Sequence, residues 1–134
     1  MKLSRECEYG LRGLLYLAQQ PVEAVCQAAE VARAAEVPQP FLSKILLKLV
    51  RHGLVRSHRG RLRGDQLGRP AAEISLKGVV EAIEGEGFFR RCALWQVACP
   101  EADPCVLHAA WQAARAQFAA ELAGTSLAEL APRR

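Results

Sequence analysis

The chain has 134 residues, 51% of them hydrophobic and 24% charged, which suits one domain with a real core and excludes a disordered chain. Residues 1–70 carry 12 Lys and Arg against 6 Asp and Glu, whereas residues 71–134 carry 6 against 8. This asymmetry predicts a polyanion-binding surface in the first part of the chain, with a merely solvated basic face as the alternative.

No segment predicts secretion or membrane insertion. The start, MKLSRECEYGLRGLL, carries charges where a secretory signal would be apolar, and even the apolar run FLSKILLKLV is interrupted by two lysines. We therefore expect a cytoplasmic protein with no membrane partner. Clustered cysteines in a reducing compartment hold a metal or sense redox more often than they form structural disulfides, and five cysteines suit a disulfide framework poorly.

Three helices are predicted in the first part of the chain. Apolar residues at helical spacing indicate a helix over 7–19 that ends near Pro21. A short Ala-rich helix follows over 27–35. After Pro38 a longer helix begins, with apolar residues from Phe41 to Val50 at helical spacing, and Gly53 ends it with a C-terminal cap. Two helices joined by a tight turn, the second long and basic, form a helix-turn-helix pattern.

A β-hairpin with an arginine-rich tip is predicted next, from a strand over 54–57, a turn over 58–64 and a returning strand over 66–68. The expected fold is therefore mainly α: a winged helix-turn-helix DNA-binding domain with a small β-hairpin wing and a long C-terminal helix. Such a helix fits the major groove, and a basic hairpin reaches the backbone or the minor groove. The candidate DNA-binding residues face outward on the long helix or alternate along the wing: Gln39, Pro40, Ser43, Lys44, Lys48, Arg59, Arg61 and Arg63.

Among these residues, the first three lie where base edges would be met, and the two lysines suit phosphates. A plain packing motif is the alternative for the helix pair.

Two further helices complete the chain. Ser75 caps a helix over 76–84, and the Asp103-Pro104 pair indicates the start of a last helix over 104–122. This terminal helix carries an apolar stripe that must be buried on its own domain or on a second copy. The stripe, the candidate dimer interface, comprises Leu107, Trp111, Ala114, Phe118 and Leu122. The expected organisation is a DNA-binding domain with its following helix over 1–84, a cysteine-rich loop over 85–105, and a dimerisation helix with a tail over 106–134.

The segment RCALWQVACPEADPCVLHAAW holds three of the five cysteines, in the spacing Cys92-x6-Cys99-x5-Cys105-x2-His108. On the predicted helix Cys105 and His108 share a face, and the helix N-terminus favours the Cys105 thiolate. Thiolates select zinc or iron–sulfur centres, and the C-x2-C knuckles of structural zinc sites are missing here. We therefore favour an iron–sulfur cluster, with zinc, a thiol switch and no role as alternatives.

The other cysteines and histidines have no predicted ligand role as a first choice. Cys26 is expected to be a small buried residue. Cys7 is expected to be buried on the first helix, with a role as an extra ligand as a minor alternative. His52 and His58 fall in the basic region and are expected to be exposed and without a metal role.

The stretch EVPQPFLSKILLKLVRHGLVRSHRG, followed by LGRPAAEISLKGVVEAIEG and the three-cysteine loop, resembles the IscR/NsrR/CymR family of winged-helix transcription regulators. The start MKLSRECEYGLRGLLYLA is similar too, so the resemblance covers nearly the whole chain. It implies a homodimer, formed by crossing C-terminal helices, that binds palindromic double-stranded promoter DNA. In cluster-bearing members the three cysteines ligate a [2Fe–2S] or [4Fe–4S] centre, and we favour [2Fe–2S].

The resemblance offers two candidates for the fourth ligand. In the IscR-like pattern it is a histidine three residues after the third cysteine, here His108. In the NsrR-like pattern it is a carboxylate on the first helix of the other subunit, and Glu8 fills that position. We favour His108 because its geometry with Cys105 is local.

Some positions depart from the family pattern. The first cysteine spacer has six residues rather than the usual five, and the wing reads RGRLRGDQL where the family commonly has RGPGGGY. The family's base-reading positions fall on Pro38, Pro40 and Ser43, and the prolines lack side-chain donors.

The expected function is a DNA-binding transcription regulator, in the first place a repressor, whose cluster senses redox, nitric oxide or iron status. A zinc or thiol-redox regulator of the same fold is the alternative. A small enzyme or redox carrier is disfavoured because no C-x-x-C pair or catalytic base accompanies a nucleophile. A metal-free adapter that binds another protein through the apolar stripe is a third class.

Overall fold

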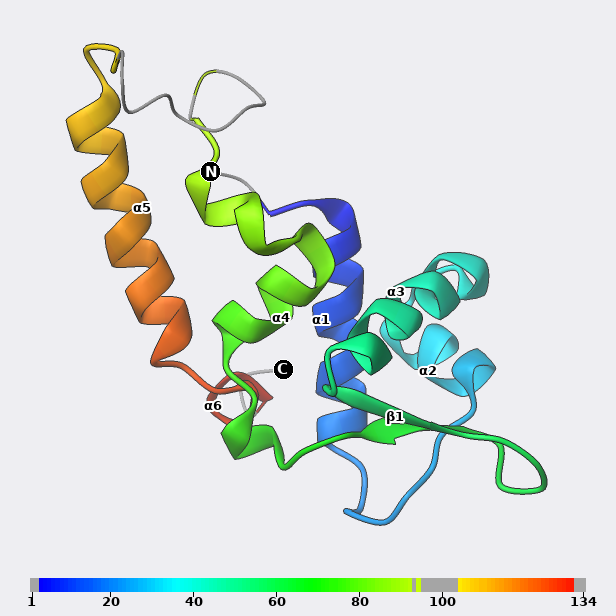
Figure 1. Cartoon of the computed structure of the whole chain (residues 1–134). Coiled ribbons are helices and arrows are strands. Elements are labelled where there is room, and N and C mark those ends of the chain that lie inside the picture. The colour runs from blue at the N-terminus through cyan, green and yellow to red at the C-terminus, as the bar shows by residue number, and fades with distance from the viewer. Residues whose placement is uncertain (1–2, 93, 95–103, 132–134) are drawn as a thin grey trace.

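The computed structural model describes residues 3–92, 94 and 104–131. Figure 1 shows helices gathered around the first helix, with a short hairpin on one side and a long helix on the other. The elements in chain order are α1 (Arg5–Ala18), α2 (Ala28–Ala35), α3 (Gln39–Arg51), β1 (Val55–His58), β2 (Gly64–Leu67), η1 (Ala71–Glu73), α4 (Leu76–Glu84), η2 (Glu86–Arg90), α5 (His108–Ala123) and α6 (Leu127–Leu130).

Helix α1 is the central element of the fold. It begins where the Ser4 hydroxyl accepts the backbone N–H of Cys7 at 3.1 Å, which is an N-cap. Its inner face packs against α2, α3, α4 and α6. A Cβ at Gly10 would lie 2.4 Å from Ile83 Cδ1 and 3.1 Å from Ile45 Cγ2, so the glycine lets α3 and α4 approach the axis of α1.

Helices α2 and α3 form the predicted helix-turn-helix. The turn between them places Glu36 in the left-handed region with φ 59°, and Val37 is buried directly after it. The inner face of α3 is the predicted stripe, with Leu42, Ile45, Leu46 and Leu49 buried. Phe41 differs from the prediction: 57% of it is exposed, because it lies at the first turn of α3, beside the groove to α1.

The wing is an antiparallel hairpin in which Val55 pairs with Leu67 and His58 with Gly64. The returning strand therefore begins two residues earlier than predicted. At its base, Cys26 and Asp65 exchange backbone hydrogen bonds of 2.9 and 2.7 Å, which fastens the hairpin to the segment before α2. Figure 1 shows the hairpin loop extending away from the helices.

The C-terminal part differs from the prediction at α5. Helix α4 begins and ends as predicted, with the Ser75 hydroxyl accepting the Gly78 N–H at 3.0 Å. Helix α5, however, begins at His108 rather than at Pro104, with Leu107 in the N-cap position. Proline suits a first helical position but does not start a helix by itself, and the β-branched Val106 disfavours one. The predicted cap Asp103 lies outside the described residues.

A short helix that the sequence patterns did not predict returns the chain to the core. Helix α6 carries a capping box, in which Ser126 and Glu129 bond each other's backbone N–H, and its Leu127 is fully buried. The Leu127 N–H also donates to the Ile74 carbonyl at 2.8 Å, and Leu76 N–H to the Thr125 carbonyl at 2.9 Å. These bonds anchor the far end of α5 beside the start of α4.

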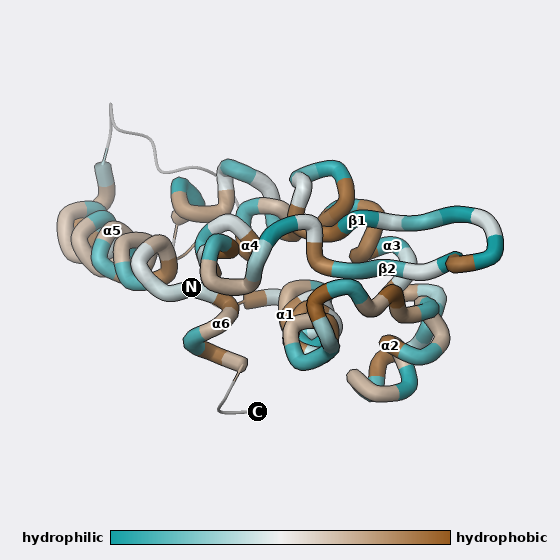
Figure 2. Tube along the Cα trace, turned by 90° about the horizontal axis from the view of Figure 1, so that it is seen from below, coloured by the Kyte–Doolittle hydropathy of each residue, from teal (hydrophilic) through white to brown (hydrophobic). Residues whose placement is uncertain are grey.

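None of the residues of α5, all of which the structure describes, is buried. Figure 2 shows α5 at the edge of the molecule, with apolar colour over much of its length. No helix within the described ranges is long and apolar enough to cross a membrane.

Candidate functional site

The outer face of α3 carries most of the candidate DNA-binding residues that were predicted for this helix. Gln39, Pro40 and Lys44 are exposed and Ser43 is half-buried, as expected for residues outside the apolar stripe. The first turn of α3 is therefore accessible to a groove of DNA.

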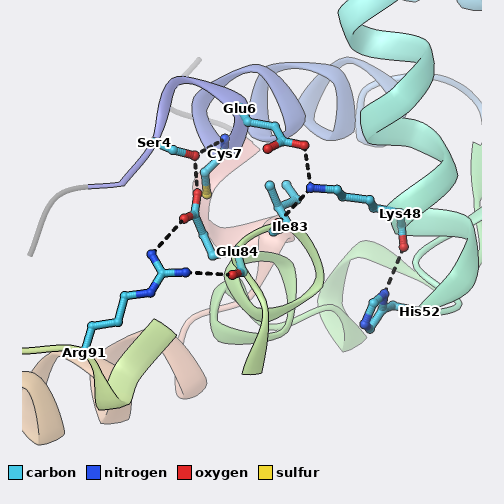
Figure 3. A network of polar contacts seen from close by, with 8 residues as sticks. All are labelled: Ser4, Glu6, Cys7, Lys48, His52, Ile83, Glu84 and Arg91. Carbon is cyan, nitrogen blue, oxygen red and sulfur yellow. Dashed lines mark hydrogen bonds and ion pairs between the residues drawn. The ribbon is translucent and has the colours of Figure 1, made fainter. Parts of the chain in front are cut away.

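Lys48 does not face outward as predicted. Its ammonium lies 2.7 Å from the Glu6 carboxylate of α1 and donates to the Ile83 carbonyl of α4 at 3.2 Å (Figure 3). The sequence pattern showed only that Lys48 avoids the apolar stripe. Its place at the edge of that stripe, toward α1 and α4, depends on how the helices pack.

The wing arginines lie in the loop rather than along the strands. Arg59, Arg61 and Arg63 are exposed, but strand pairing ends at His58 and Gly64, so the predicted strand alternation does not arrange them. Between Arg61 and Arg63, Leu62 is 78% exposed.

The start of α3 and the wing share one surface. A hollow between them is lined by Gln39 of α3, by His58, Arg63 and the Asp65 carboxylate of the wing, and by residues 27–29 at the start of α2. Two elements that are separate in sequence thus offer their polar and cationic groups to the same space. Helix N-termini and arginines both favour anions such as phosphate.

The cysteine segment lies where η2 ends and α5 begins. Cys92 is half-buried, and its Sγ accepts the Leu94 N–H at 3.4 Å. Cys105 is exposed and precedes α5, with its carbonyl accepting the His108 N–H at 3.1 Å. The predicted helical face shared by Cys105 and His108 is therefore wrong. Cys99 lies outside the described residues.

The environment of the His108 side chain tests whether this segment suits a metal centre with thiolate and imidazole ligands. It is half-buried, and its Nδ1 is buried without a hydrogen-bond partner in the part of the chain that the structure describes. A buried ring nitrogen ordinarily has a partner, so one without any suits a ligand. Thiolate and imidazole donors fit an iron–sulfur cluster or zinc. Within the described ranges no three His, Cys, Asp or Glu side chains already form a metal-holding group.

Glu8, the alternative fourth ligand, is exposed on α1. Its carboxylate pairs with Arg12 of the same helix at 2.9 Å. Exposed pairs of this kind are weak, so Glu8 is not committed to its own subunit.

Cys7 and Cys26 are buried, as predicted for Cys26 and as the first choice for Cys7. Burial raises the pKa of Cys7 to about 11, and the nearby Glu84 and Glu6 carboxylates add to the shift. Burial likewise raises the pKa of Cys26, together with Glu30 and Asp65. Both thiols stay protonated at neutral pH and are poor ligands in this form.

The helix pair α2–α3, followed by a basic hairpin and packed on α1 and α4, defines a winged helix-turn-helix protein. A family model described as Rrf2, an iron-dependent transcriptional regulator, matches residues 3–133. The chain belongs to the Rrf2 family, and it is accordingly a transcriptional regulator and not an enzyme. This confirms the predicted family and fold.

Relatives and solved structures match over almost the whole chain. Protein aau3 of Rhizobium meliloti (strain 1021) is 38% identical over 131 residues, which are 97% of this chain and 84% of aau3. The oxidized form of Staphylococcus aureus CymR is 28% identical with a TM-score of 0.77, covering 98% of this chain and 96% of that one. T. potens IscR shares the fold, with 22% identity and a TM-score of 0.76 over 97% and 85%.

Proposed function

We propose that the protein is a cytoplasmic homodimer that binds double-stranded promoter DNA through α3 and the wing, and that the cysteine segment controls this binding. One observation carries the DNA-binding part: Gln39, His58 and Arg63 line one hollow with the start of α2. A phosphate placed there would fix the register of α3 in the major groove, while the wing loop follows the neighbouring backbone or minor groove.

The dimer is supported by the state of α5. Phe118 is 38% exposed, and with Trp111, Ala114 and Arg115 it borders a hollow on the helix surface. Leu107 is also exposed, while Leu122 is half-buried against the core. A second α5 crossing this stripe would bury it, and a two-fold pair of α3 helices would then meet half-sites about one helical turn apart.

The proposed cofactor is an iron–sulfur cluster, [2Fe–2S] in preference to [4Fe–4S]. Cys92, Cys99, Cys105 and His108 would hold it, with Glu8 of the other subunit as the alternative fourth ligand. The buried His108 Nδ1, which has no hydrogen-bond partner among the described residues, supports this assignment, as does the exposure of Cys105. When bound, such a cluster supplies a group that oxidants, nitric oxide or iron shortage can alter.

A thiol switch without a cluster is the second candidate. Its support is that Cys105 is exposed and that a structural relative, Staphylococcus aureus CymR, has a structure of an oxidized form. The triple substitution of Cys92, Cys99 and Cys105 by Ser would abolish regulation under either candidate, so metal content must separate them.

The experiment combines metal analysis with DNA binding. Protein purified without oxygen is assayed for iron, sulfide and visible absorbance, and is then used to enrich genomic DNA fragments. We expect iron and sulfide in a fixed ratio to the chain, and salt-sensitive binding of a palindromic fragment whose strength changes when the cluster is removed. Iron-free protein that resists reconstitution would exclude the cluster, and absence of DNA binding in every state would exclude the proposal.

A further inference from the structure

A polar network joins the residue before Cys92 to the last turn of α4 (Figure 3). The Arg91 guanidinium donates to the Glu84 carbonyl at 3.2 Å and lies 3.8 Å from the Glu84 carboxylate. It also lies 5.4 Å from the ring centre of Phe88 in η2. Because Arg91 adjoins Cys92 in the chain, a displacement of the Cys92 backbone moves these contacts directly.

The carbonyl of the same residue is held by α5. It accepts the Trp111 Nε1–H at 2.8 Å and an Arg115 guanidinium N–H at 3.2 Å. Arg91 thus connects α4 through its side chain and α5 through its backbone. It is a junction between the cysteine segment, the candidate dimer helix and the DNA-binding domain.

Helix α3 contacts this same C-terminal end of α4 from the other side, through Lys48. The last carbonyls of an α-helix have no partner within the helix. In α4, the Ile83 carbonyl accepts Lys48 Nζ of α3 and the next carbonyl, that of Glu84, accepts Arg91. Lys48 also pairs with Glu6, and the Glu84 carboxylate accepts the Ser4 hydroxyl that caps α1. Cations suit this end of a helix because its carbonyls carry partial negative charge.

From this shared helix end we infer that Arg91 and Lys48 are positioning residues that transmit the state of the cysteine segment to α3. The inference rests on the proposed function. A change at Cys92 alters how Arg91 holds the end of α4, and Lys48 carries the change to the angle of α3 against α1. The Lys48–Glu6 pair is partly exposed and adds little to stability, whereas the Glu84 side chain that Arg91 faces is only 9% exposed. Arg91 and Lys48 act on the position of α3. Because both α3 helices of a dimer must fit their half-sites at the same time, a small change in this position weakens DNA binding.

The test compares the DNA affinity of two cysteine states of each variant. One state is reconstituted without oxygen from ferrous iron and sulfide, and the other is stripped with a chelator under reductant. The probe is a genomic fragment enriched by the wild-type protein. The variants are Arg91→Ala and Lys48→Ala. The matched control is Arg90→Ala, which removes an exposed neighbouring charge from η2.

We expect the wild-type affinities to differ between the two states by a factor of about 5 or more, the low end of common allosteric coupling. Arg91→Ala and Lys48→Ala should reduce that factor below about 2, whereas Arg90→Ala keeps it. Hydrogen exchange of residues 39–51 without DNA should differ between the states in the wild type and not in the two variants. A purely structural role would change both states equally.

Each other outcome has a definite meaning. If both variants fold and keep the wild-type factor and exchange difference, the inference is wrong while the proposed function stands. If the wild type binds equally in both states, the proposed regulation fails and the inference fails with it. Should Arg91→Ala load no iron, Lys48→Ala decides the result, because Lys48 lies outside the cysteine segment.

Discussion

Gly64 lies where the wing meets the segment before α2. Its φ is 150°, and a Cβ would lie 2.6 Å from the Cys26 carbonyl oxygen and 2.8 Å from its carbon. The obstacle is backbone that is fixed by the Cys26–Asp65 hydrogen bonds, so it cannot rotate away. The lack of a side chain at Gly64 therefore lets the base of the hairpin pack directly against the Cys26 backbone.

We therefore expect Gly64→Ala to reduce the free energy of unfolding by about 2 kcal/mol or more, through backbone strain and overpacking. Urea denaturation followed by circular dichroism measures it. Gly87→Ala is the control, because no atom of the described residues lies within 4 Å of its added Cβ and its φ is not in the left-handed region. Equal stability of the two variants would contradict the assignment.

The Cys7 thiol predicts an alkaline loss of stability. Its pKa is about 11 in the folded chain against an ordinary 9.0, so the unfolded chain releases this proton first. The contribution of the protonated Cys7 thiol to the free energy of unfolding is complete below pH 9. It is lost as the pH rises toward 11, by about 2 to 3 kcal/mol at most. A second loss begins near pH 10, because a hydrogen bond to Glu30 raises the pKa of Tyr16 to about 12.

Urea unfolding of the wild type and of Cys7→Ala between pH 8 and 11 separates the two groups. The variant should lose the part of the decline above pH 9 that Cys7 contributes. It should keep the losses from Cys26 and Tyr16, whose pKa values are also raised in the folded chain, whatever its stability at pH 8. The same decline between pH 9 and 10 in both proteins would show that Cys7 is not the group that titrates.

At the scale of single elements, the wing is defined by its loop rather than by its strands. The three wing arginines and Lys44 make four exposed cations per subunit. A dimer that neutralised one phosphate with each would lose affinity with salt at a log–log slope of roughly −7, at about −0.9 per phosphate.

We expect Arg61→Ala to weaken DNA binding for all sequences and to reduce the size of that slope by about 2 per dimer. Gel shifts over a range of salt concentrations measure it. Arg90→Ala removes the same charge from η2 and should leave the slope unchanged. An unaltered slope for Arg61→Ala would remove the wing loop from the interface.

Helices α5 and α6 show how local signals succeed or fail at element ends. The Ser126-x2-Glu129 capping box is visible in the sequence and could have predicted α6. The start of α5 could not be located in this way, because Leu107 offers no side-chain cap and Pro104 was the stronger signal. Cys105 therefore lies before the helix, and its position relative to His108 depends on the conformation of residues 106 and 107.

At the scale of the whole molecule, α5 is a helix with no buried residue whose two ends are nonetheless fixed. Arg91 holds it near Trp111, and α6 holds it beyond Gly124. A helix kept in place while Leu107, Ala114 and Phe118 of its apolar stripe stay exposed is suited to a second copy of itself.

We expect Phe118→Glu to yield a monomer that folds but binds the palindromic fragment at least about tenfold more weakly, because one of two half-sites is lost. Sedimentation analysis gives the mass. Ala116→Glu places the same charge on the other side of α5 and should remain dimeric. A dimeric Phe118→Glu would show that this stripe is not the interface.

Periodicity, caps and breakers were enough to predict α1 to α4, the hairpin and the burial of Cys26, because each depends on residues close together in the chain. The outer face of α3 followed from the same patterns. Only the tertiary structure decided that Lys48 turns inward to Glu6 and Ile83, that Gln39 and Arg63 share a hollow, and that Arg91 joins α4 to α5. These contacts join residues that are far apart in the sequence, so they depend on how the helices pack, which no local pattern records.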